Sequence, residues 1–195
     1  MTARDDRERW DRQHAAGRAN QEPSSFLKET LQNDHWPIPR GKALDLATGK
    51  GRNAIFLAEQ GFAVLGIDIS PVALAEAQRC AEARSLSIAW QQADLEAIEL
   101  PPVRYDLVAN FNYLQRSLVP QIKTTLKPGG WVIFETYLID QQAVGRPKNP
   151  DYLLRHNELL ELFRDFRVVY YREGRVVRSG ENAFFAGLLA QKASY

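Results

Sequence analysis

Apolar and polar positions alternate in blocks along the middle of this 195-residue chain. After position 42 an apolar run ends in Asp45, and a turn with two glycines follows. A helical pattern then begins near Arg52, and a second apolar run ends in Asp68. A strand, a helix and a second strand in this order predict a βαβ unit with parallel strands. Both strands of the unit therefore end in an acidic residue.

The same alternation continues toward the C-terminus. Ser70 and Pro71 have the residue types of a helix N-cap and first turn, and they predict a helix to about Arg84. An alternating strand ending at Asp94 and an apolar strand ending at Asn110 follow. The chain thus places a polar side chain at the end of four successive predicted strands.

A further helix is predicted from apolar residues at four-residue steps, namely Leu118, Ile122 and Leu126. It stops at 127–130 and leads into a fifth, strongly apolar strand. After a polar loop we expect a helix from Glu158 to about Asp165. Two final strands are expected near Phe166–Arg172 and Ala183–Gln191, joined by the polar stretch 173–182.

These elements predict a single α/β domain over residues 1–195. Its core is a doubly wound, mostly parallel, seven-stranded sheet with helices on both faces and an antiparallel C-terminal hairpin. Residues 1–40 precede the sheet and predict two short amphipathic helices, around Asp5–Ala15 and Ser24–Gln32. They form either a lid over a ligand or a simple packing layer.

The turn after the first strand indicates a ligand that carries a positive charge. Gly49 and Gly51 allow the backbone to approach a ligand closely, and a carboxylate such as Asp68 can accept hydrogen bonds from two ribose hydroxyls. Asp45 would repel a pyrophosphate but attract an ammonium group. The dinucleotide pattern G-x-G-x-x-G is also not met, because Ala47 and Ala54 replace its first and last glycines. An NAD-linked oxidoreductase is therefore disfavoured.

The chain resembles the class I S-adenosylmethionine (SAM)-dependent methyltransferases. The resemblance rests on the segments LDLATGKG, GIDIS, ADL, YDLVANFNYL and LKPGGWVIFETY in that order. Within the class it is similar to the tellurite-resistance methyltransferases, through WDRQHAAG, GKGRNAIFLAEQGF and PKNPDYLLRHNELLELF. One departure is Ala47, where the class usually has glycine; alanine is tolerable there if the backbone keeps ordinary angles.

The resemblance implies SAM as cofactor and a role for each matching residue. Asp45 and the turn at Ala47, Thr48, Gly49 and Gly51 would hold the methionyl end. Asp68 would bind the ribose, while Ile69, Asp94 and Leu95 would surround the adenine. Asn110 and Phe111 would lie nearest the transferred methyl group.

Methyl transfer is an in-line displacement at a sulfonium carbon, so alignment and exclusion of water matter most. A soft or oxyanionic acceptor, such as a thiol, selenite or tellurite, needs little or no general base. The candidates for the acceptor pocket are Trp10, His14, Tyr113, Arg116, Tyr137, Arg155 and His156. Arg116 suits an oxyanion because its planar guanidinium matches such groups. For several of them packing or helix capping is an equally good explanation.

Composition narrows the possible partners. Lys and Arg number 25 against 24 Asp and Glu, so no charge excess drives binding to nucleic acid or membranes. The single cysteine, Cys80, and the charged N-terminus indicate a reducing cytoplasm. Three scattered histidines lack the spacing of metal ligands, so no metal is expected.

The leading hypothesis is a methyltransferase for a small molecule. The alternative is a degenerate, non-catalytic interaction module with the same fold.

Overall fold

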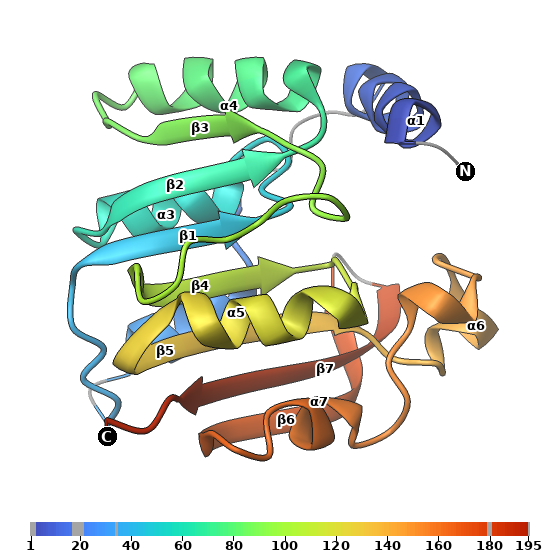
Figure 1. Ribbon diagram of the computed structural model, residues 1–195. Helices are drawn as coiled ribbons and strands as arrows, with labels where there is room; N and C mark the ends of the chain where they lie inside the picture. Colours follow the sequence, from blue (N-terminus) through green and yellow to red (C-terminus); the bar gives the residue numbers. More distant parts are fainter. Residues whose placement is uncertain (1–2, 17–21, 34, 179–180, 195) are drawn as a thin grey trace.

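One twisted sheet runs through the computed structural model, which describes residues 3–16, 22–33, 35–178 and 181–194 (Figure 1). Its seven strands lie in the order β3-β2-β1-β4-β5-β7-β6 within these residues. The strands are β1 (Lys42–Leu46), β2 (Ala63–Asp68), β3 (Ala89–Gln92), β4 (Tyr105–Phe111), β5 (Leu126–Tyr137), β6 (Arg167–Arg178) and β7 (Glu181–Gln191). The first five pair in parallel, and β7 pairs antiparallel with both β5 and β6. The predicted fold class is confirmed.

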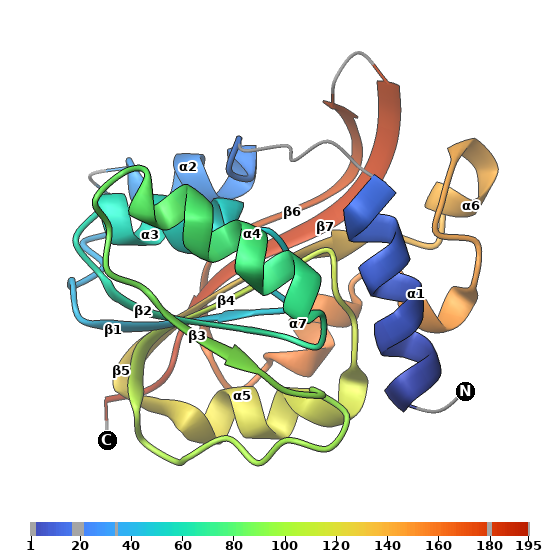
Figure 2. The same cartoon turned by 90° about the horizontal axis from the view of Figure 1, so that it is seen from above.

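Helices cover both faces of the sheet (Figure 2). One face carries α2 (Ser25–Leu31), α3 (Arg52–Glu59) and α4 (Pro71–Glu82), and the other carries η1 (Arg116–Leu118), α5 (Val119–Thr125) and α7 (Glu158–Leu162). Beyond the carboxyl ends of the parallel strands lie α1 (Ala3–Ala16) and α6 (Gln141–Val144), and the short turn η2 (Pro150–Tyr152) follows α6.

The alternation of side chains along each strand divides the apolar core into two layers. In β1, Leu44 and Leu46 belong to the cluster under α5 and α7, while Ala43 belongs to the cluster under α2 and α3. Because successive side chains point to opposite faces, Asp45 lies on the same face as Ala43. The Asp45 side chain thus lies on the side of the sheet that carries α3.

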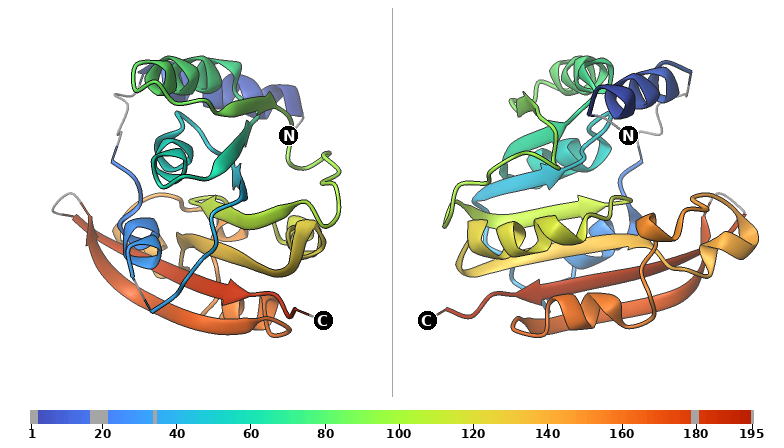
Figure 3. Two further views of the ribbon diagram at one scale, coloured as in Figure 1. Left: turned by 90° about the vertical axis from the view of Figure 1, so that its left-hand side faces the viewer. Right: turned by 45° about the vertical axis from the view of Figure 1, so that its right-hand side comes forward.

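The N-terminal segment has two parts with different surroundings. Phe26 and Leu27 of α2 are fully buried in the core layer beneath that helix. In contrast, α1 lies beside α4 at the edge of the sheet (Figures 1 and 3). Among the described residues before β1, any lid function therefore belongs to α1.

The C-terminal hairpin is longer than expected. We predicted a polar connection over 173–182, but β6 and β7 pair from Arg167↔Gln191 through Arg178↔Glu181. The polar residues led us to predict a loop. They belong instead to a strand, because β6 is the edge strand of the sheet and its outward side chains face solvent. Polar sequence there reflects exposure and not a loop.

Two other boundaries also differ from the prediction. Residues 127–130 were expected as a helix stop before the fifth strand, yet they lie inside β5. They form an irregularity in its pairing with β4, where Gly129 has φ 74°. The helix α7 ends at Leu162 and not near Asp165. Among the residues described, no helix has the length and apolar character needed to cross a membrane.

Candidate cofactor and acceptor site

Asp45 is the last residue but one of β1, and 1% of its surface is exposed. Its Oδ2 accepts a hydrogen bond from the Thr48 hydroxyl, and the Thr48 amide donates to the carbonyl of Ile67 in β2. Burial raises the pKa of Asp45 to about 7, although the Thr48 hydrogen bond and the charge of Arg52 act in the opposite direction. Near neutral pH this carboxyl therefore exists in both protonation states.

Asp68 ends β2 and holds the turn that follows β1. Its Oδ2 accepts from the amide of Gly49 at 2.7 Å, and its Oδ1 accepts from the amide of Ser70 at 2.9 Å. The Asp68 carboxylate thus joins the turn after β1 to the residue that caps α4.

The turn itself uses left-handed backbone at three positions, Ala47 (φ 50°), Gly49 (φ 55°) and Gly51 (φ 77°). Ala47 does not keep the ordinary angles that we expected to make alanine tolerable, because the turn reverses the chain at this position. At Gly51 a Cβ would lie 2.8 Å from both the Ala77 Cβ and the Trp90 ring. Gly51 is therefore required for packing against α4 and β3, independently of any ligand.

The remaining cofactor candidates lie at the same edge of the sheet. Asn110 pairs with Leu46 in register, and its side-chain amide donates to the carbonyl of Tyr113 at 2.7 Å. Asn110 and the adjacent Phe111 are both buried. The structure thus places the ends of β1, β2 and β4 side by side.

The adenine candidates follow β2 and β3. Ile69 and Asp94 are half-buried, whereas Leu95 is buried in the core layer under α5. Asp94 Oδ1 accepts from the amide of Glu96 at 2.9 Å, which holds the turn after β3. Ile69 directly follows β2, whereas Asp94 lies two residues beyond the end of β3 and not, as we predicted, at its end. The adenine-binding roles of these residues stay predictions.

Residues before β1 form hydrogen bonds with the N-terminal ends of two helices at the carboxyl edge of the sheet. The Ser70 hydroxyl, which caps α4, donates to Asp11 of α1 at 2.5 Å. Further along, Arg52 donates to the carbonyl of Glu22 at 3.2 Å, and the Ser24 amide donates to Asn53 at 2.9 Å. Residues 11 and 22–24 therefore contact the N-terminal ends of α4 and α3 respectively.

Two predicted acceptor residues also lie in α1. Trp10 is half-buried, and the Arg9 guanidinium lies 5.4 Å from the centre of its ring. The side chain of His14 is outside the described part of the structure.

Arg116 has a clear structural partner. It forms an ion pair with Glu158 through bonds of 2.6 and 3.0 Å, and it donates to the carbonyls of Asp151 and Leu153, each at 2.9 Å. The Glu158 side chain is 3% exposed. Although burial raises the pKa of Glu158, hydrogen bonds from Arg116 and the Arg155 amide hold it below its usual value. This arrangement favours the packing interpretation of Arg116.

The two tyrosine candidates and Arg155 make contacts within the protein. Tyr113 is half-buried, and its hydroxyl donates to Gln115. The Tyr137 ring lies 4.3 Å from that of Phe185, centre to centre. The Arg155 side chain is exposed and pairs with Glu158 and Glu161.

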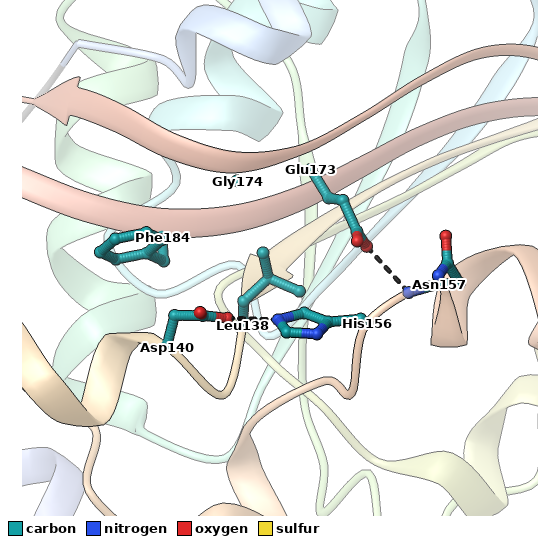
Figure 4. Close-up of a pocket in the computed structure, with 7 residues that line it drawn as sticks. All are labelled: Leu138, Asp140, His156, Asn157, Glu173, Gly174 and Phe184. Atoms are coloured by element: carbon teal, nitrogen blue, oxygen red, sulfur yellow. Dashed lines mark hydrogen bonds and ion pairs between the residues drawn. The ribbon is translucent and has the colours of Figure 1, made fainter.

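His156 lies in a cavity of about 350 Å³ between the end of β5, the turn before α7 and the β6–β7 hairpin (Figure 4). Its Nε2 lies 2.6 Å from Asp140 Oδ2. This hydrogen bond and the charge of Asp140 raise the pKa of the imidazole. The remaining wall includes Leu138, Glu173 and Phe184. Below, this space is called the hairpin cavity.

Sequence reasoning found His156 but missed Asp140, Glu173 and Phe184. Each comes from a different part of the chain, and only the long polar loop after β5 hinted at a site there. No periodicity or short motif joins these residues.

Residues 43–130 match a family model described as a methyltransferase domain. The matched segment extends from β1 into β5 and so includes every predicted cofactor residue.

Two of the curated relatives are named as methyltransferases. The probable SAM-dependent methyltransferase TehB of Haemophilus influenzae is 28% identical over 165 residues, which cover 77% of this chain and 57% of that protein. The demethylmenaquinone methyltransferase of Thermus thermophilus is 37% identical over 100 residues, 47% of this chain and 45% of the relative. The chain spans about half the length of the curated relatives it matches.

Solved structures share the fold. The crystal structure of TehB from Haemophilus influenzae has a TM-score of 0.74 at 22% identity and covers 87% of this chain and 62% of that one. A structure described as the conversion of a disulfide bond into a thioacetal group during echinomycin biosynthesis has a TM-score of 0.76 at 18% identity. It covers 96% of this chain and 92% of that one.

The matched domain, the relatives and the shared fold support the predicted class, the class I SAM-dependent methyltransferases. The similarity to TehB over 77% of this chain supports the TehB-like branch within that class, as its sequence segments predicted.

Proposed function

We propose that the chain transfers a methyl group from SAM to a small, soft or oxyanionic acceptor of the thiol, selenite or tellurite type. The observation that carries this proposal is the pair of buried carboxylates, Asp45 and Asp68, at the ends of adjacent strands. One of them faces the turn through Thr48 and the other through Gly49. A pair of carboxylates beside left-handed backbone suits a ligand with an ammonium group and a ribose.

The residues present fit SAM. When bound, SAM supplies the electrophilic methyl group. In the proposed arrangement Asp45 binds the ammonium, Asp68 accepts from the ribose hydroxyls, and Asp94 accepts from the adenine amine. Asn110 and Phe111 border the space in front of the methyl group, where alignment of the acceptor can supply as much as ~7–11 kcal/mol of the barrier.

The helix α1 serves in this proposal as a lid. Its hydrogen bond from Ser70 to Asp11 and the contacts of Glu22 and Ser24 with the start of α3 support that role. A lid excludes water, which strengthens each electrostatic contact within the site. A soluble cytoplasmic location and a small-molecule partner belong to the same proposal.

The first experiment measures thermal unfolding with S-adenosylhomocysteine (SAH), with NAD as control. A ligand at a hundredfold its dissociation constant adds roughly 2.7 kcal/mol of stability, a shift of a few degrees for a chain of this size. A shift with SAH alone supports the cofactor, whereas no shift contradicts the proposal.

The second experiment separates the enzyme from a non-catalytic module. SAH formation from SAM is measured with a thiol, selenite and tellurite in turn. Turnover with one of them supports the enzyme. SAH binding without turnover on any acceptor favours the alternative, a module that binds SAM for another purpose.

A further inference from the structure

A carboxylate is buried in the sheet beside the predicted methyl position. Glu135 lies in β5, and none of its surface is exposed. It pairs in register with Phe111 of β4, so the two Cα atoms lie about 4.8 Å apart and both side chains point to the same face of the sheet. That face carries α2 and α3, since Phe111 belongs to the core layer beneath them. In contrast, the hairpin cavity is lined by Leu138, which belongs to the other core layer.

Glu135 is bonded to the N-terminal segment. Its Oε1 accepts a hydrogen bond from the Ser24 hydroxyl at 2.8 Å, and its Oε2 accepts from Arg172 of β6 at 3.3 Å. Ser24 is 3% exposed, so both partners of the first hydrogen bond are shielded from water. A buried carboxylate costs free energy unless it is paired, and a hydrogen bond to a charged group is stronger than one between neutral groups. The bond between Ser24 and Glu135 is therefore a strong link between the N-terminal segment and β5.

The same serine is also joined to the start of α3. Its amide donates to the Asn53 side chain at 2.9 Å, and two residues earlier the carbonyl of Glu22 accepts from Arg52 at 3.2 Å. Residues 22–24, called the strap below, are thus held both by α3, which follows the turn after β1, and by β5. Because β4 lies between β1 and β5, the strap reaches across β4.

The strap borders the part of the site that we expect to hold the methionyl end of the cofactor. Asn53 is followed by Ala54, whose amide donates to Asp45, the carboxylate proposed to bind the ammonium group. At its other attachment the strap is bonded to Glu135, the register neighbour of Phe111. The adenine candidates follow β2 and β3, on the opposite side of β1 from β4. The strap is therefore placed to cover the methionyl end and not the adenine.

We propose that Glu135 is a positioning residue of the methyl-transfer site, and that it acts through Ser24 by holding the strap closed over the methionyl end of the cofactor. This inference rests on the proposed function, from which it takes the place of the methionyl end. A closed strap excludes water from the reacting groups and keeps them aligned. Release of SAH requires the strap to open, so the bond between Ser24 and Glu135 governs how fast SAH leaves.

The first test weakens this bond without a change of size. Glu135→Gln keeps an oxygen that accepts from Ser24 but removes its charge. We expect SAH to dissociate about fivefold faster in surface plasmon resonance, because a hydrogen bond to a neutral group is weaker than one to a charged group. Glu29→Gln is the matched control, since Glu29 is the other carboxylate that pairs with Arg172, at 2.8 Å. It should keep the wild-type rate.

The second test locates the effect on the ligand. Adenosine has the adenine and ribose of SAH but lacks its amino acid part. In calorimetry, Glu135→Gln and Ser24→Ala should both bind SAH more weakly than the wild type and bind adenosine with unchanged affinity. Equal losses for SAH and adenosine would show a general disturbance of the sheet edge and would overturn the inference.

The third test shows whether Glu135 acts through Ser24. In the double variant Ser24→Ala/Glu135→Gln, the second substitution should cost no further SAH affinity, because the hydrogen bond is already absent. Ser24→Thr keeps a hydroxyl and should restore the wild-type affinity. Additive losses in the double variant would contradict the proposed route through Ser24.

Stability needs its own control, because the Ser24 hydroxyl also caps α2. Leu31→Ala weakens α2 at its other end, where Leu31 is buried in the same core layer. We expect Leu31→Ala to lower the unfolding temperature at least as much as Ser24→Ala does, yet to leave SAH affinity unchanged. A matching loss of SAH affinity in Leu31→Ala would assign the effect to α2 and not to the strap.

The outcomes separate the two proposals. Faster loss of SAH, unchanged adenosine binding and a non-additive double variant support the inference. Wild-type SAH affinity in a folded Glu135→Gln variant overturns it and leaves the proposed function standing. Failure of the wild type to bind SAH overturns the proposed function itself, and the inference with it.

Discussion

The carboxyl edge of the sheet has two halves that are built in different ways. On the β1–β2 half, the carboxylates of Asp45 and Asp68 accept from groups in adjacent turns, among them the amides of Gly49 and Ser70. On the β5–β7 half, side chains distant in sequence pair with one another. His156 meets Asp140 across 16 residues, and Arg116 meets Glu158 across 42.

The two halves differ in what fixes the positions of their polar groups. Backbone amides after a strand occupy fixed positions once the βαβ unit forms, so the first half depends little on the rest of the fold. Side-chain pairs between loops depend on how those loops pack. We therefore expect substitutions in the first half to affect cofactor affinity, and those in the loop pairs of the second to affect stability or acceptor choice.

The largest expected effect is on Asp68. In the proposed cofactor site, Asp68→Ala removes the charged acceptor of the ribose hydroxyls, and hydrogen bonds to charged groups contribute ~1.5–3 kcal/mol each. We expect the dissociation constant for SAH, measured by calorimetry, to rise by about a hundredfold. Asp165→Asn, at the opposite edge of the sheet, serves as control. A folded Asp68→Ala variant with unchanged affinity would contradict the site assignment.

The next prediction removes the ion pair between Arg116 and Glu158 on the β5–β7 half and leaves the β1–β2 half unchanged. Arg116→Ala leaves the buried Glu158 without its main partner, and we expect a loss of about 2 kcal/mol in urea unfolding, because Arg116 is itself partly exposed. SAH affinity should stay the same. The exposed Arg164→Ala is the matched control, and equal stability of the two variants would show that the pair contributes nothing.

The same pair gives stability a pH dependence with a defined sign. Because the folded pKa of Glu158 is lowered, its contribution is present above the unfolded value of 4.5 and is lost as pH falls through the folded value. This acid sensitivity should shrink in Arg116→Ala, as measured by urea midpoints between pH 3 and 6.

Asp45 should behave in the opposite way. Its raised pKa, about 7, means that the unliganded fold loses stability as pH rises from the unfolded value of 3.8 through about 7. The SAH ammonium requires the ionised form, so affinity should weaken about tenfold per pH unit below 7. Calorimetry with Asp45→Asn, or with adenosine as ligand, should give a flat profile; a flat profile for the wild type with SAH would refute the pairing.

The smallest effect concerns the strained turn. Ala47 has φ 50°, a conformation that costs an L-residue about 1–2 kcal/mol, and glycine removes that cost while losing more entropy on folding. Ala47→Gly should therefore stabilise the chain by up to ~1 kcal/mol. Ala54→Gly, inside α3, should destabilise it by about as much. A stability loss in Ala47→Gly would show that the turn is relaxed.

The sequence predicted the parallel sheet and its strand ends because apolar runs, glycine turns and caps are local signals. Asp45, Asp68 and Asn110 follow directly from such runs. The length of the hairpin was missed because an edge strand needs no apolar outer face, as at Arg172 and Glu173. The strain at Ala47 was missed because residue type alone does not fix a backbone angle.

The β5–β7 half was less predictable for a different reason. Arg116 looked like an anion ligand by its chemistry, but its place depends on a loop 42 residues further along. Asp140 became part of a site only through the fold of that loop around His156. Contacts of this kind are properties of tertiary packing, and no short pattern encodes them.

The position of Trp90 gives the chain an optical probe. Its ring lies against Gly51 and Gly66, where an added Cβ would approach ring atoms to 2.8 and 2.6 Å. The indole therefore borders the turn between Asp45 and Asp68, and it is one of four in the chain. Replacing Trp10, Trp36 and Trp131 by phenylalanine would leave a single emitter beside the ligand, so that stopped-flow fluorescence could time the arrival of SAM without a chemical label.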